Sequence, residues 1–458
     1  MDLLVSAFLN SRIALADLDS GQVEVMPMRE DMAAQGMGGI GAASLLHGLY
    51  RASDPLVLGT GPLTGSFAPA SCLLTATFSP GTASLIHVPF LEHTGPGMKF
   101  AGIDYLVVIG RAPQPISLDL LDGTVRITPA GDIEGTLSQR ESAIRSRRGP
   151  CPDSILLTGS AADSGSNGAV LSCGLWGSMD KTSLGSYAAA KNIRAVTFKA
   201  TRGVAFPRDG LERGATLMKT LHRDGKSRRT AVPKLMEGSE AAARLIGRHF
   251  RKSHACRHCP LACVSYLEFR PAGLGLRKFR APAQGLFVMD HEGFGALAAV
   301  RPQDAHELMR HCIELGYDPI RAAQELESEL STEDAIERIT GLCTQDPPET
   351  GPGFREAQDA ARVPRQLHGL FGGGIPRILP SGADDGFDTW QRRVSLAMIL
   401  GVCPVMMLYY HQLRADDLLA FISADAGVLA DLKSGVLDLC DSLTARPSGQ
   451  AGASSGRG

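Results

Sequence analysis

Three cysteines lie within eight residues of one another near the middle of the chain, at Cys256, Cys259 and Cys263. Their C-x2-C-x3-C spacing lets one tight loop supply three sulfurs to a cubane iron–sulfur cluster, with the fourth position left to a distant cysteine. Structural zinc usually takes its ligands as two separated pairs, so the spacing favours iron–sulfur over zinc. His254 and His258 keep a zinc site as the alternative, because cysteine and histidine often share such sites.

The surroundings of this loop bear on its chemistry. The cations Lys252 and Arg257 predict that the nearby thiols ionise easily, and thiolate is the form that binds metal. A disulfide framework is less favoured, because Met1 to Leu9 lacks the basic leader of a secretory signal. The remaining cysteines also occur singly along the chain, at Cys72, Cys151, Cys173, Cys312, Cys343, Cys403 and Cys440.

Length and composition set the bounds of the fold. The 458 residues are enough for two to four domains. The net charge of −2 and the isoelectric point near 6.6 imply neither nucleic acid nor an anionic membrane as a partner. No apolar run reaches the roughly 18 residues that a membrane-spanning helix needs. We therefore expect a cytoplasmic protein that binds neither nucleic acid nor membranes.

The pattern of residues changes near position 205 and predicts an α+β fold. Short apolar runs between turn signals predict a β-rich N-terminal domain, and apolar residues at three- and four-residue spacing then predict helices. The expected strands are 13–18, 22–25, 105–109, 116–121, 125–127, 155–158 and 195–199, and the expected helices are 211–221, 237–250, 302–315, 319–330 and 415–432.

The same pattern divides the chain into five parts. The β-rich domain spans 1–205, and a helical domain with the cysteine loop spans 206–345. A shortened loop or linker, a C-terminal helical segment and a Ser/Gly-rich disordered tail then follow, at 346–391, 392–446 and 447–458.

Gly36 to Gly41 satisfies the G-x-G-x-x-G pattern of dinucleotide-binding proteins. That fingerprint requires a strand directly before it and an acidic residue about twenty positions later. Here the preceding segment, Met28 to Gln35, is polar and helix-like, and no carboxylate stands near Gly61. The favoured interpretation is that these glycines allow close backbone packing.

Several short motifs resemble, in order, those of the aldehyde:ferredoxin oxidoreductases. They are Gly59 to Ser66, Lys99 to Asp104, Lys191 to Val196, the cysteine loop and Leu400 to Cys403, and the opening hairpin and the Asp416 to Gly427 helix add to them. The resemblance covers most of residues 12–345 and 392–430. It implies a shortened, divergent member with two N-terminal β-sheets and largely helical domains after them.

This resemblance also implies cofactors and partners. Cys403 would supply the fourth ligand of a [4Fe-4S] cluster, beside a tungsten or molybdenum bis-pterin. Oxidation of a small aldehyde to a carboxylic acid would send electrons to ferredoxin or another iron–sulfur carrier. The oligomeric state, homo- or hetero-oligomeric, stays open.

The resemblance places the pterin between three segments. Gly-rich turns and cations are needed to bind its phosphates, and a fixed carboxylate is needed for its ring N–H groups. The candidates are Thr94, Gly95, Gly97, Lys99, Lys181, Gly185, Gly316 and Asp318. The alternative is a purely structural role, in which these lysines are solvated, the glycines only form turns, and Asp318 begins a helix.

Several residues depart from the family pattern. Ile313 and Met398 stand where the family carries pterin-binding acidic residues, and Asp180 lies beside the presumed phosphate contact. The usual catalytic glutamate aligns with Gly285, so no catalytic residue is assigned; Asp290 and Glu292 could replace it only in a re-routed loop. His368 lies in the shortened stretch, where a solvated loop histidine is the favoured interpretation. Two hypotheses follow: an active oxidoreductase, or a degenerate paralogue that keeps the cluster for electron transfer or as a scaffold.

Overall fold

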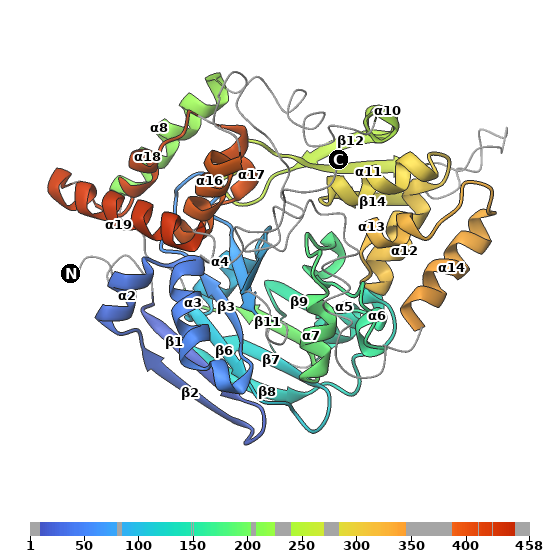
Figure 1. Ribbon diagram of the computed structural model, residues 1–458, viewed down its shortest axis with the longest axis horizontal. Helices are drawn as coiled ribbons and strands as arrows, with labels where there is room; N and C mark the ends of the chain where they lie inside the picture. Colours follow the sequence, from blue (N-terminus) through green and yellow to red (C-terminus); the bar gives the residue numbers. More distant parts are fainter. Residues whose placement is uncertain are drawn as a thin grey trace, which may run out of the picture.

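Three β-sheets and the helices around them make up the protein in the computed structural model (Figure 1). The structure describes residues 10–79, 85–147, 149, 151–202, 208–224, 240–269, 284–344, 387–410, 412–423 and 425–444. The predicted boundary at 205, residues 1–9, most of the linker and the tail lie outside these residues. The five-part division of the chain therefore stays a prediction.

The first sheet has six strands in the order β2-β1-β6-β3-β4-β5. The predicted hairpin forms one edge of this sheet. Its turn is closed because the Asp17 carboxylate accepts from the backbone N–H groups of Asp19 and Ser20. Strand β6 runs parallel to β1 and antiparallel to β3. The strands are β1 (Arg12–Asp17), β2 (Gln22–Pro27), β3 (Leu56–Thr60), β4 (Leu74–Phe78), β5 (Ile86–Phe90) and β6 (Tyr105–Ile109).

The second sheet has five strands in the order β10-β9-β11-β7-β8. Side chains of both sheets share one apolar core, to which Leu58 and Val88 contribute from the first sheet and Leu118 and Phe198 from the second. The two predicted N-terminal sheets are thus confirmed. The strands are β7 (Ile116–Leu121), β8 (Thr124–Pro129), β9 (Ser154–Thr158), β10 (Leu171–Ser172) and β11 (Ile193–Lys199).

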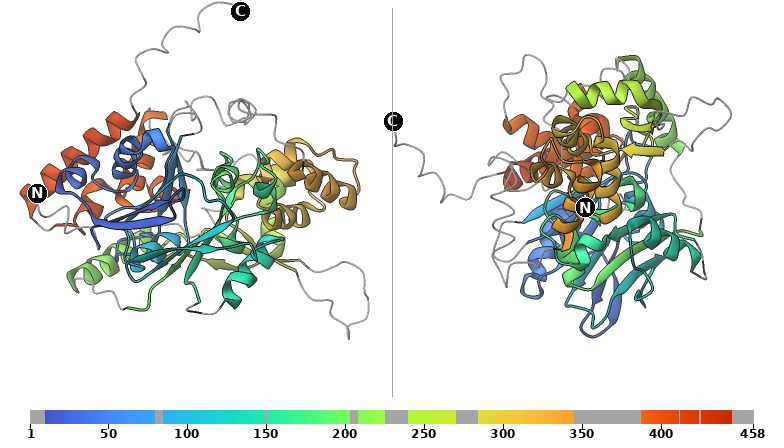
Figure 2. Two further views of the ribbon diagram at one scale, coloured as in Figure 1. Left: turned by 90° about the horizontal axis from the view of Figure 1, so that it is seen from below. Right: turned by 90° about the vertical axis from the view of Figure 1, so that its right-hand side faces the viewer.

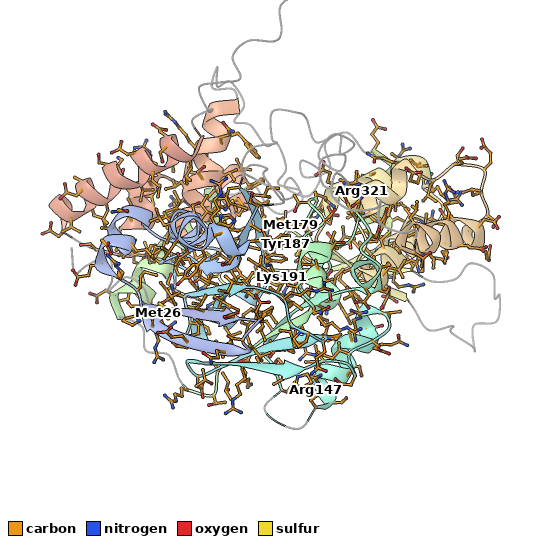
Figure 3. All side chains as sticks on the ribbon, turned by 60° about the horizontal axis from the view of Figure 1, so that its bottom comes forward. Met26, Arg147, Met179, Tyr187, Lys191 and Arg321 are labelled. Carbon is orange, nitrogen blue, oxygen red and sulfur yellow. The ribbon has the colours of Figure 1, made fainter. Side chains whose placement is uncertain are left out.

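Short helices connect and cover these strands (Figure 2). Helix α7 carries Tyr187, whose hydroxyl donates to Asp54. Its C-cap residue, Lys191, places its ammonium over the Tyr187 ring at 5.3 Å (Figure 3). The N-terminal helices are α2 (Glu30–Gly36), α3 (Gly39–Leu49), α4 (Thr94–Phe100), α5 (Leu137–Ser146), α6 (Ser160–Asp163) and α7 (Leu184–Ala190), with the 3₁₀ turns η1 (Arg51–Ser53) and η2 (Gly174–Trp176).

The later half is mainly helical, as predicted, but it also contains a three-stranded antiparallel sheet, β12-β13-β14. The expected 237–250 helix ends at His249, and Phe250 begins β12. The predicted 319–330 and 415–432 helices are shorter or split. The elements are α8 (Arg208–Asp224), α10 (Glu240–His249), β12 (Phe250–His254), β13 (Val264–Phe269), β14 (Gln284–Val288), α11 (His291–Val300), α12 (Ala305–Leu315), α13 (Pro319–Gln324) and α14 (Thr332–Thr344).

The C-terminal helices return to the N-terminal half, where Figure 1 shows α19 beside α2 and α3. Gly39 lies so close to α16 that an added Cβ would stand 1.9 Å from the Met398 carbonyl oxygen. The Gly36 to Gly41 run therefore serves close helix packing and follows a helix, not a strand. The C-terminal helices are α16 (Phe387–Leu400), α17 (Pro404–Tyr409), α18 (Ala415–Leu419) and α19 (Ala426–Thr444). None of the described helices has the length and apolarity to cross a bilayer.

Candidate redox centre

The cysteine loop connects β12 to β13 and docks onto residues 65–70 of the N-terminal half. The Ala70 N–H donates to the His258 carbonyl at 2.9 Å, and the His258 ring lies 3.0 Å from the Ser66 carbonyl oxygen. Within the loop, the Cys259 N–H donates to the Cys256 carbonyl at 3.0 Å. These bonds fix the loop backbone, so the sulfurs are held in position before any metal binds.

Cys403 reaches the same place from the C-terminal helices. Helix α16 ends at Leu400, Gly401 turns the chain with a φ of 84°, and Cys403 is the N-cap of α17. The Cys403 N–H donates to the Ala70 carbonyl at 2.9 Å. The Ala70 residue thus joins the cysteine loop through its N–H group and the Cys403 turn through its carbonyl.

The four predicted ligands interact with one another in one group, in which Cys256 and Cys403 are buried and Cys259 and Cys263 are half-buried. Burial, and then the charges of Cys259 and Cys256, raise the pKa of Cys403 well above its usual value. Burial, and then Cys256, raise the pKa of Cys259 to about 12. Burial, and then the charges of Cys259, Cys256 and Cys403, raise the pKa of Cys263. The structure therefore brings together side chains from positions 256–263 and 403.

The predicted easy ionisation is wrong for Cys259 and Cys263, whose pKa values are raised. Arg257 turns away from the sulfurs, because its guanidinium lies over the Phe100 ring at 5.0 Å and donates to the Gly65 carbonyl. Lys252 lies over the Tyr266 ring, 5.2 Å from its centroid. Burial and mutual repulsion between the thiolates then dominate. A bound metal cation would reverse this balance, because it stabilises the deprotonated sulfur.

Backbone N–H groups already point at two of the sulfurs. Those of Leu261 and Ala262 donate to the Cys259 sulfur, and those of Val405 and Met406 donate to the Cys403 sulfur. Such bonds favour the thiolate, and hydrogen bonds to cluster sulfurs help set the reduction potential of iron–sulfur centres. The donor set and its surroundings therefore fit an iron–sulfur cluster.

A fifth cysteine belongs to this group, although its isolated place in the sequence gave no sign of it. Cys72 is fully buried, and a hydrogen bond with Cys256, followed by burial, raises its pKa well above the usual value. The Leu73 N–H, next in the chain, donates to the Gly401 carbonyl. Together with the Ala70 bonds to the cysteine loop and to Cys403, this long-range contact places Cys72 beside the loop.

The first predicted pterin segment is committed to internal contacts. The Lys99 ammonium lies 3.1 Å from the Asp104 carboxylate and donates to the Gly61 carbonyl at 2.8 Å, and both side chains are buried. Burial lowers the pKa of Lys99, although Asp104 opposes this. The Thr94 hydroxyl donates to the Leu91 carbonyl. Gly95 packs against the Leu73 backbone and Gly97 against Ser154, so both glycines serve close packing.

The second and third predicted segments meet each other. The Lys181 ammonium lies 2.7 Å from Asp290 and 2.8 Å from Asp318, and all three side chains are buried. Although burial alone lowers the pKa of Lys181, the two carboxylates raise it above the ordinary value. Gly185 packs against Val170, and Gly316 packs against Gly159 with a φ of 67°. Asp318 also begins a helix, because its carboxylate accepts from the Ile320 N–H at 3.0 Å.

These contacts do not fit a pterin cradle as predicted from the sequence. The three charges of Lys181, Asp290 and Asp318 sum to −1, which would repel a phosphate. Lys99 and Asp104 cancel each other. Asp290 is already bound to Lys181 and caps α11 through the Gly293 N–H, so it is not free to replace a catalytic glutamate at Gly285. His368 lies outside the described residues.

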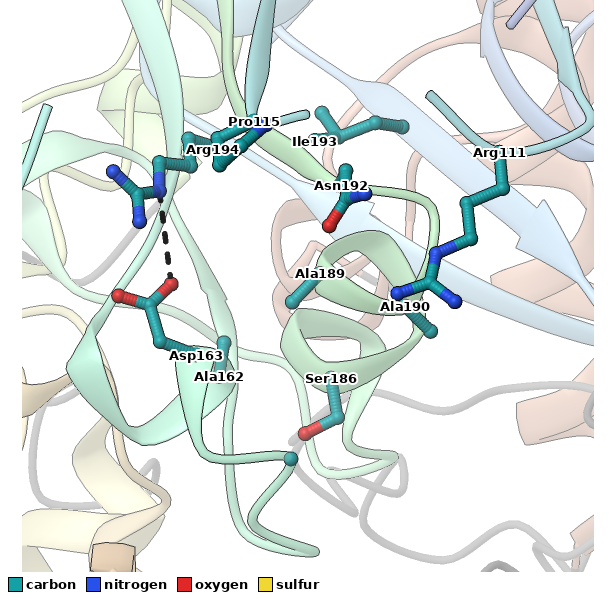
Figure 4. A pocket seen from close by; sticks show the side chains of 11 residues that line it. Arg111, Pro115, Ala162, Asp163, Ser186, Ala189, Ala190, Asn192, Ile193 and Arg194 are labelled. Carbon is teal, nitrogen blue, oxygen red and sulfur yellow. Dashed lines mark ion pairs between the residues drawn. The ribbon is translucent and has the colours of Figure 1, made fainter. Parts of the chain in front are cut away.

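A separate pocket of about 280 Å³ opens between α6, α7 and β11. Figure 4 shows that Arg194 faces Asp163 across it, and their charged atoms lie 3.9 Å apart. Arg111 extends into the pocket from the opposite side (Figure 4). This pocket shares no lining residue with the cysteine centre, so we do not assign it a part in redox chemistry.

The fold and the thiol group define an α+β protein with two N-terminal sheets, a third small sheet and a group of cysteine thiols between the two halves. The sequence model of the aldehyde ferredoxin oxidoreductase N-terminal domain matches residues 13–200. The chain therefore carries the N-terminal domain of the aldehyde ferredoxin oxidoreductase family, as its motifs predicted. The two sheets and their shared core are this domain.

Curated relatives extend the match to individual proteins. The tungsten-containing aldehyde ferredoxin oxidoreductase of Pyrococcus furiosus is 27% identical over 205 residues, which are 42% of this chain and 34% of that protein. The protein of the same description from Thermococcus kodakarensis is 27% identical over 203 residues, with the same coverage of both chains. The match thus spans about a third of the length of these relatives.

One solved structure resembles almost the whole chain. It is the active site complex BamBC of benzoyl coenzyme A reductase with bound 1,5-dienoyl-CoA. The TM-score between the two structures is 0.65. The likeness covers 95% of this chain and 88% of that chain at 14% identity. At this identity the likeness concerns the fold alone, and it extends beyond the N-terminal domain into the helical half.

Proposed function

We propose that this chain is an iron–sulfur redox protein of the aldehyde ferredoxin oxidoreductase type. Cys256, Cys259, Cys263 and Cys403 bind one [4Fe-4S] cluster, which exchanges single electrons with ferredoxin or another iron–sulfur carrier. The observation that carries the proposal is the meeting of these four cysteines, of which Cys256 and Cys403 are buried and the other two half-buried, with N–H donors aimed at two of the sulfurs. The family match supports redox chemistry, because the relatives are named as oxidoreductases.

The residues around the sulfurs support this role in three ways. Cys256 and Cys403 are buried and Cys259 and Cys263 are half-buried, so the lowered local dielectric strengthens charge interactions there. The N–H donors at Cys259 and Cys403 stabilise negative charge on sulfur and raise the reduction potential. Ala70 holds the two ligand segments together, so that gain or loss of an electron requires little rearrangement. Thiols of this kind persist in the reducing cytoplasm, where we place the protein.

Aldehyde oxidation on a tungsten or molybdenum bis-pterin is the second candidate, because the relatives are tungsten-containing aldehyde ferredoxin oxidoreductases. The pairing of Lys99 and Lys181 with buried carboxylates speaks against it, because the predicted phosphate contacts are already used. We therefore favour electron transfer, or a scaffold role that keeps the cluster, over aldehyde chemistry. The partner and any oligomeric assembly stay predictions.

Metal analysis of the whole chain purified without oxygen tests the proposal. We expect about four iron and four sulfide per chain, a broad visible absorbance that bleaches on reduction, and no stoichiometric tungsten or molybdenum. Zinc without sulfide that is lost in Cys259→Ala would support the zinc alternative instead. Stoichiometric tungsten with reduction of ferredoxin by an aldehyde would replace our proposal with the second candidate.

A further inference from the structure

We propose that Glu92, His93 and His254 form a second metal site, for a divalent transition-metal ion of the zinc or iron(II) class. One ligand atom from each of these residues lies within 4.8 Å of the others. The His254 Nε2 atom is 2.9 Å from Glu92 Oε2. None of the three residues was predicted from the sequence to bind metal together with the other two.

The distances suit a metal with nitrogen and oxygen ligands. Ligand atoms about 2.0–2.2 Å from a tetrahedral ion stand roughly 3.3 Å from each other. The Glu92–His254 pair is within half an ångström of this separation, so a metal ion could replace the hydrogen bond between them with little movement. Rotation of the exposed His93 side chain would bring in the third ligand.

The ligands come from two segments that the fold fixes firmly. Glu92 and His93 lie between β5 and α4, and His254 is the last residue of β12. Glu92 is only 2% exposed and has a φ of 63°, in the left-handed region that costs energy for a residue with a side chain. A buried carboxylate held in this way needs a cation nearby, and a metal ion supplies one.

Aromatic rings hold the His254 imidazole in place. The Trp176 ring lies 4.6 Å from it, and Phe287 packs against Trp176 at 4.4 Å. Residues that contact a metal-binding histidine usually fix the orientation of its imidazole. This packing limits the ring to orientations near Glu92, so little rotational freedom is lost when a metal binds.

The ligand set points to one class of ion. Two imidazoles and one carboxylate suit zinc and iron(II), whereas calcium and magnesium prefer oxygen ligands throughout. Three protein ligands leave at least one position for water. The site differs in chemistry from the cysteine centre, although the two are neighbours: the Cys256 sulfur donates to Glu92 Oε1 at 3.6 Å. One carboxylate thus touches both, and an ion bound to Glu92 would lie close to a predicted cluster ligand.

Zinc binding to the full chain, purified without oxygen and freed of loosely bound metal, tests the site. We expect one zinc ion to bind, and His93→Ala and Glu92→Gln each to weaken binding more than about 10-fold, the smallest loss seen when outer-shell partners are removed. His93→Ala is the decisive variant, because its exposed side chain leaves the core intact. His222→Ala, an exposed histidine on α8, is the matched control and should bind zinc as the parent does.

Cobalt(II) reports on the ligands and on the distance to the cluster. Cobalt at this site should give weak visible bands without the intense sulfur-to-cobalt absorption that cysteine ligands produce. In protein with a reduced cluster, it should broaden the electron paramagnetic resonance signal, whereas zinc should not. Equal zinc affinity in the parent, His93→Ala and Glu92→Gln would overturn the proposal. Metal bound at a cluster-free cysteine centre is told apart by that sulfur-to-cobalt absorption, so failure of the iron analysis would leave this test intact.

Discussion

The cysteine centre and the lysine pairs are both buried polar groups near the middle of the molecule, but their charges differ in kind. The cysteines pack like with like, so each sulfur opposes ionisation of the next. Lys181 and Lys99 instead lie against carboxylates. A group of like acids becomes favourable only when a cation is added, whereas an ion pair is already complete. The cysteine centre would therefore be stabilised by a bound cation, whereas the lysine pairs stabilise the fold as they are.

The largest expected effect would break the cysteine side of this comparison. Replacing Cys403 by Ala removes one of four sulfurs, so we expect most of the bound iron and the visible absorbance to be lost. Iron and sulfide analysis of anaerobic protein measures this. Cys440→Ala is the matched control, because Cys440 is equally buried in the same apolar core but belongs to α19. Unchanged iron in Cys403→Ala would remove Cys403 from the site.

The next effect tests whether Lys181 is structural. Lys181→Met leaves Asp290 and Asp318 buried beside each other without a cation, and breaking a buried pair costs about 3–5 kcal/mol. Urea unfolding of the metal-free chain should show this loss of unfolding free energy. After reconstitution, the variant should bind as much iron as the parent does. Lys433→Ala breaks an exposed pair with Asp416 and should cost less than about 1 kcal/mol. Similar small losses in both variants would contradict a structural role.

The sequence predicted what depends on neighbours along the chain. The C-x2-C-x3-C loop and strands such as Tyr105–Ile109 follow from local spacing and alternation. It could not predict Cys72 beside Cys256, because contacts of residues 70–73 with segments far away in the sequence, the cysteine loop and the C-terminal turn, bring them together. The pairing of Lys181 with carboxylates 109 and 137 positions away was hidden for the same reason.

Two other errors had physical causes. The β12–β14 sheet was missed because a helix-like spacing ran directly into a short strand. Easy thiol ionisation was predicted from the nearness of Lys252 and Arg257 in sequence, but both cations turn toward aromatic rings. Sequence distance says little about which way a long side chain points.

A buried histidine of the N-terminal sheet gives a third kind of group, one that stays neutral. Burial, and then nearby His47, lower the pKa of His87 to about 3. Its stabilising effect is complete above the usual pKa of 6.5 and is lost as the pH falls toward 3, because the unfolded chain takes up the proton first. We expect about 2 kcal/mol less stability at pH 5 from this group alone.

Urea unfolding at pH 7 and pH 5 checks this expectation. His87→Gln cannot take up the proton and can still accept from the Thr77 hydroxyl, which lies 2.8 Å from His87 Nδ1. This variant should lose about 2 kcal/mol less between the two pH values than the parent does. An equal pH dependence in both proteins would mean that other groups cause the acid sensitivity.

The smallest effect asks whether Cys72 donates to the cluster or binds it. Its thiol bonds to Cys256, so beside a bound cluster it would be a weak donor to a ligand sulfur. Removing such a donor in Cys72→Ala should leave iron unchanged and lower the reduction potential by about 20–60 mV, the equivalent of one hydrogen bond of 0.5–1.5 kcal/mol. Cys72→Ser keeps a donor and should restore most of the shift. If instead Cys72→Ala loses iron as Cys403→Ala does, Cys72 is a ligand, and the centre must be redrawn around five sulfurs.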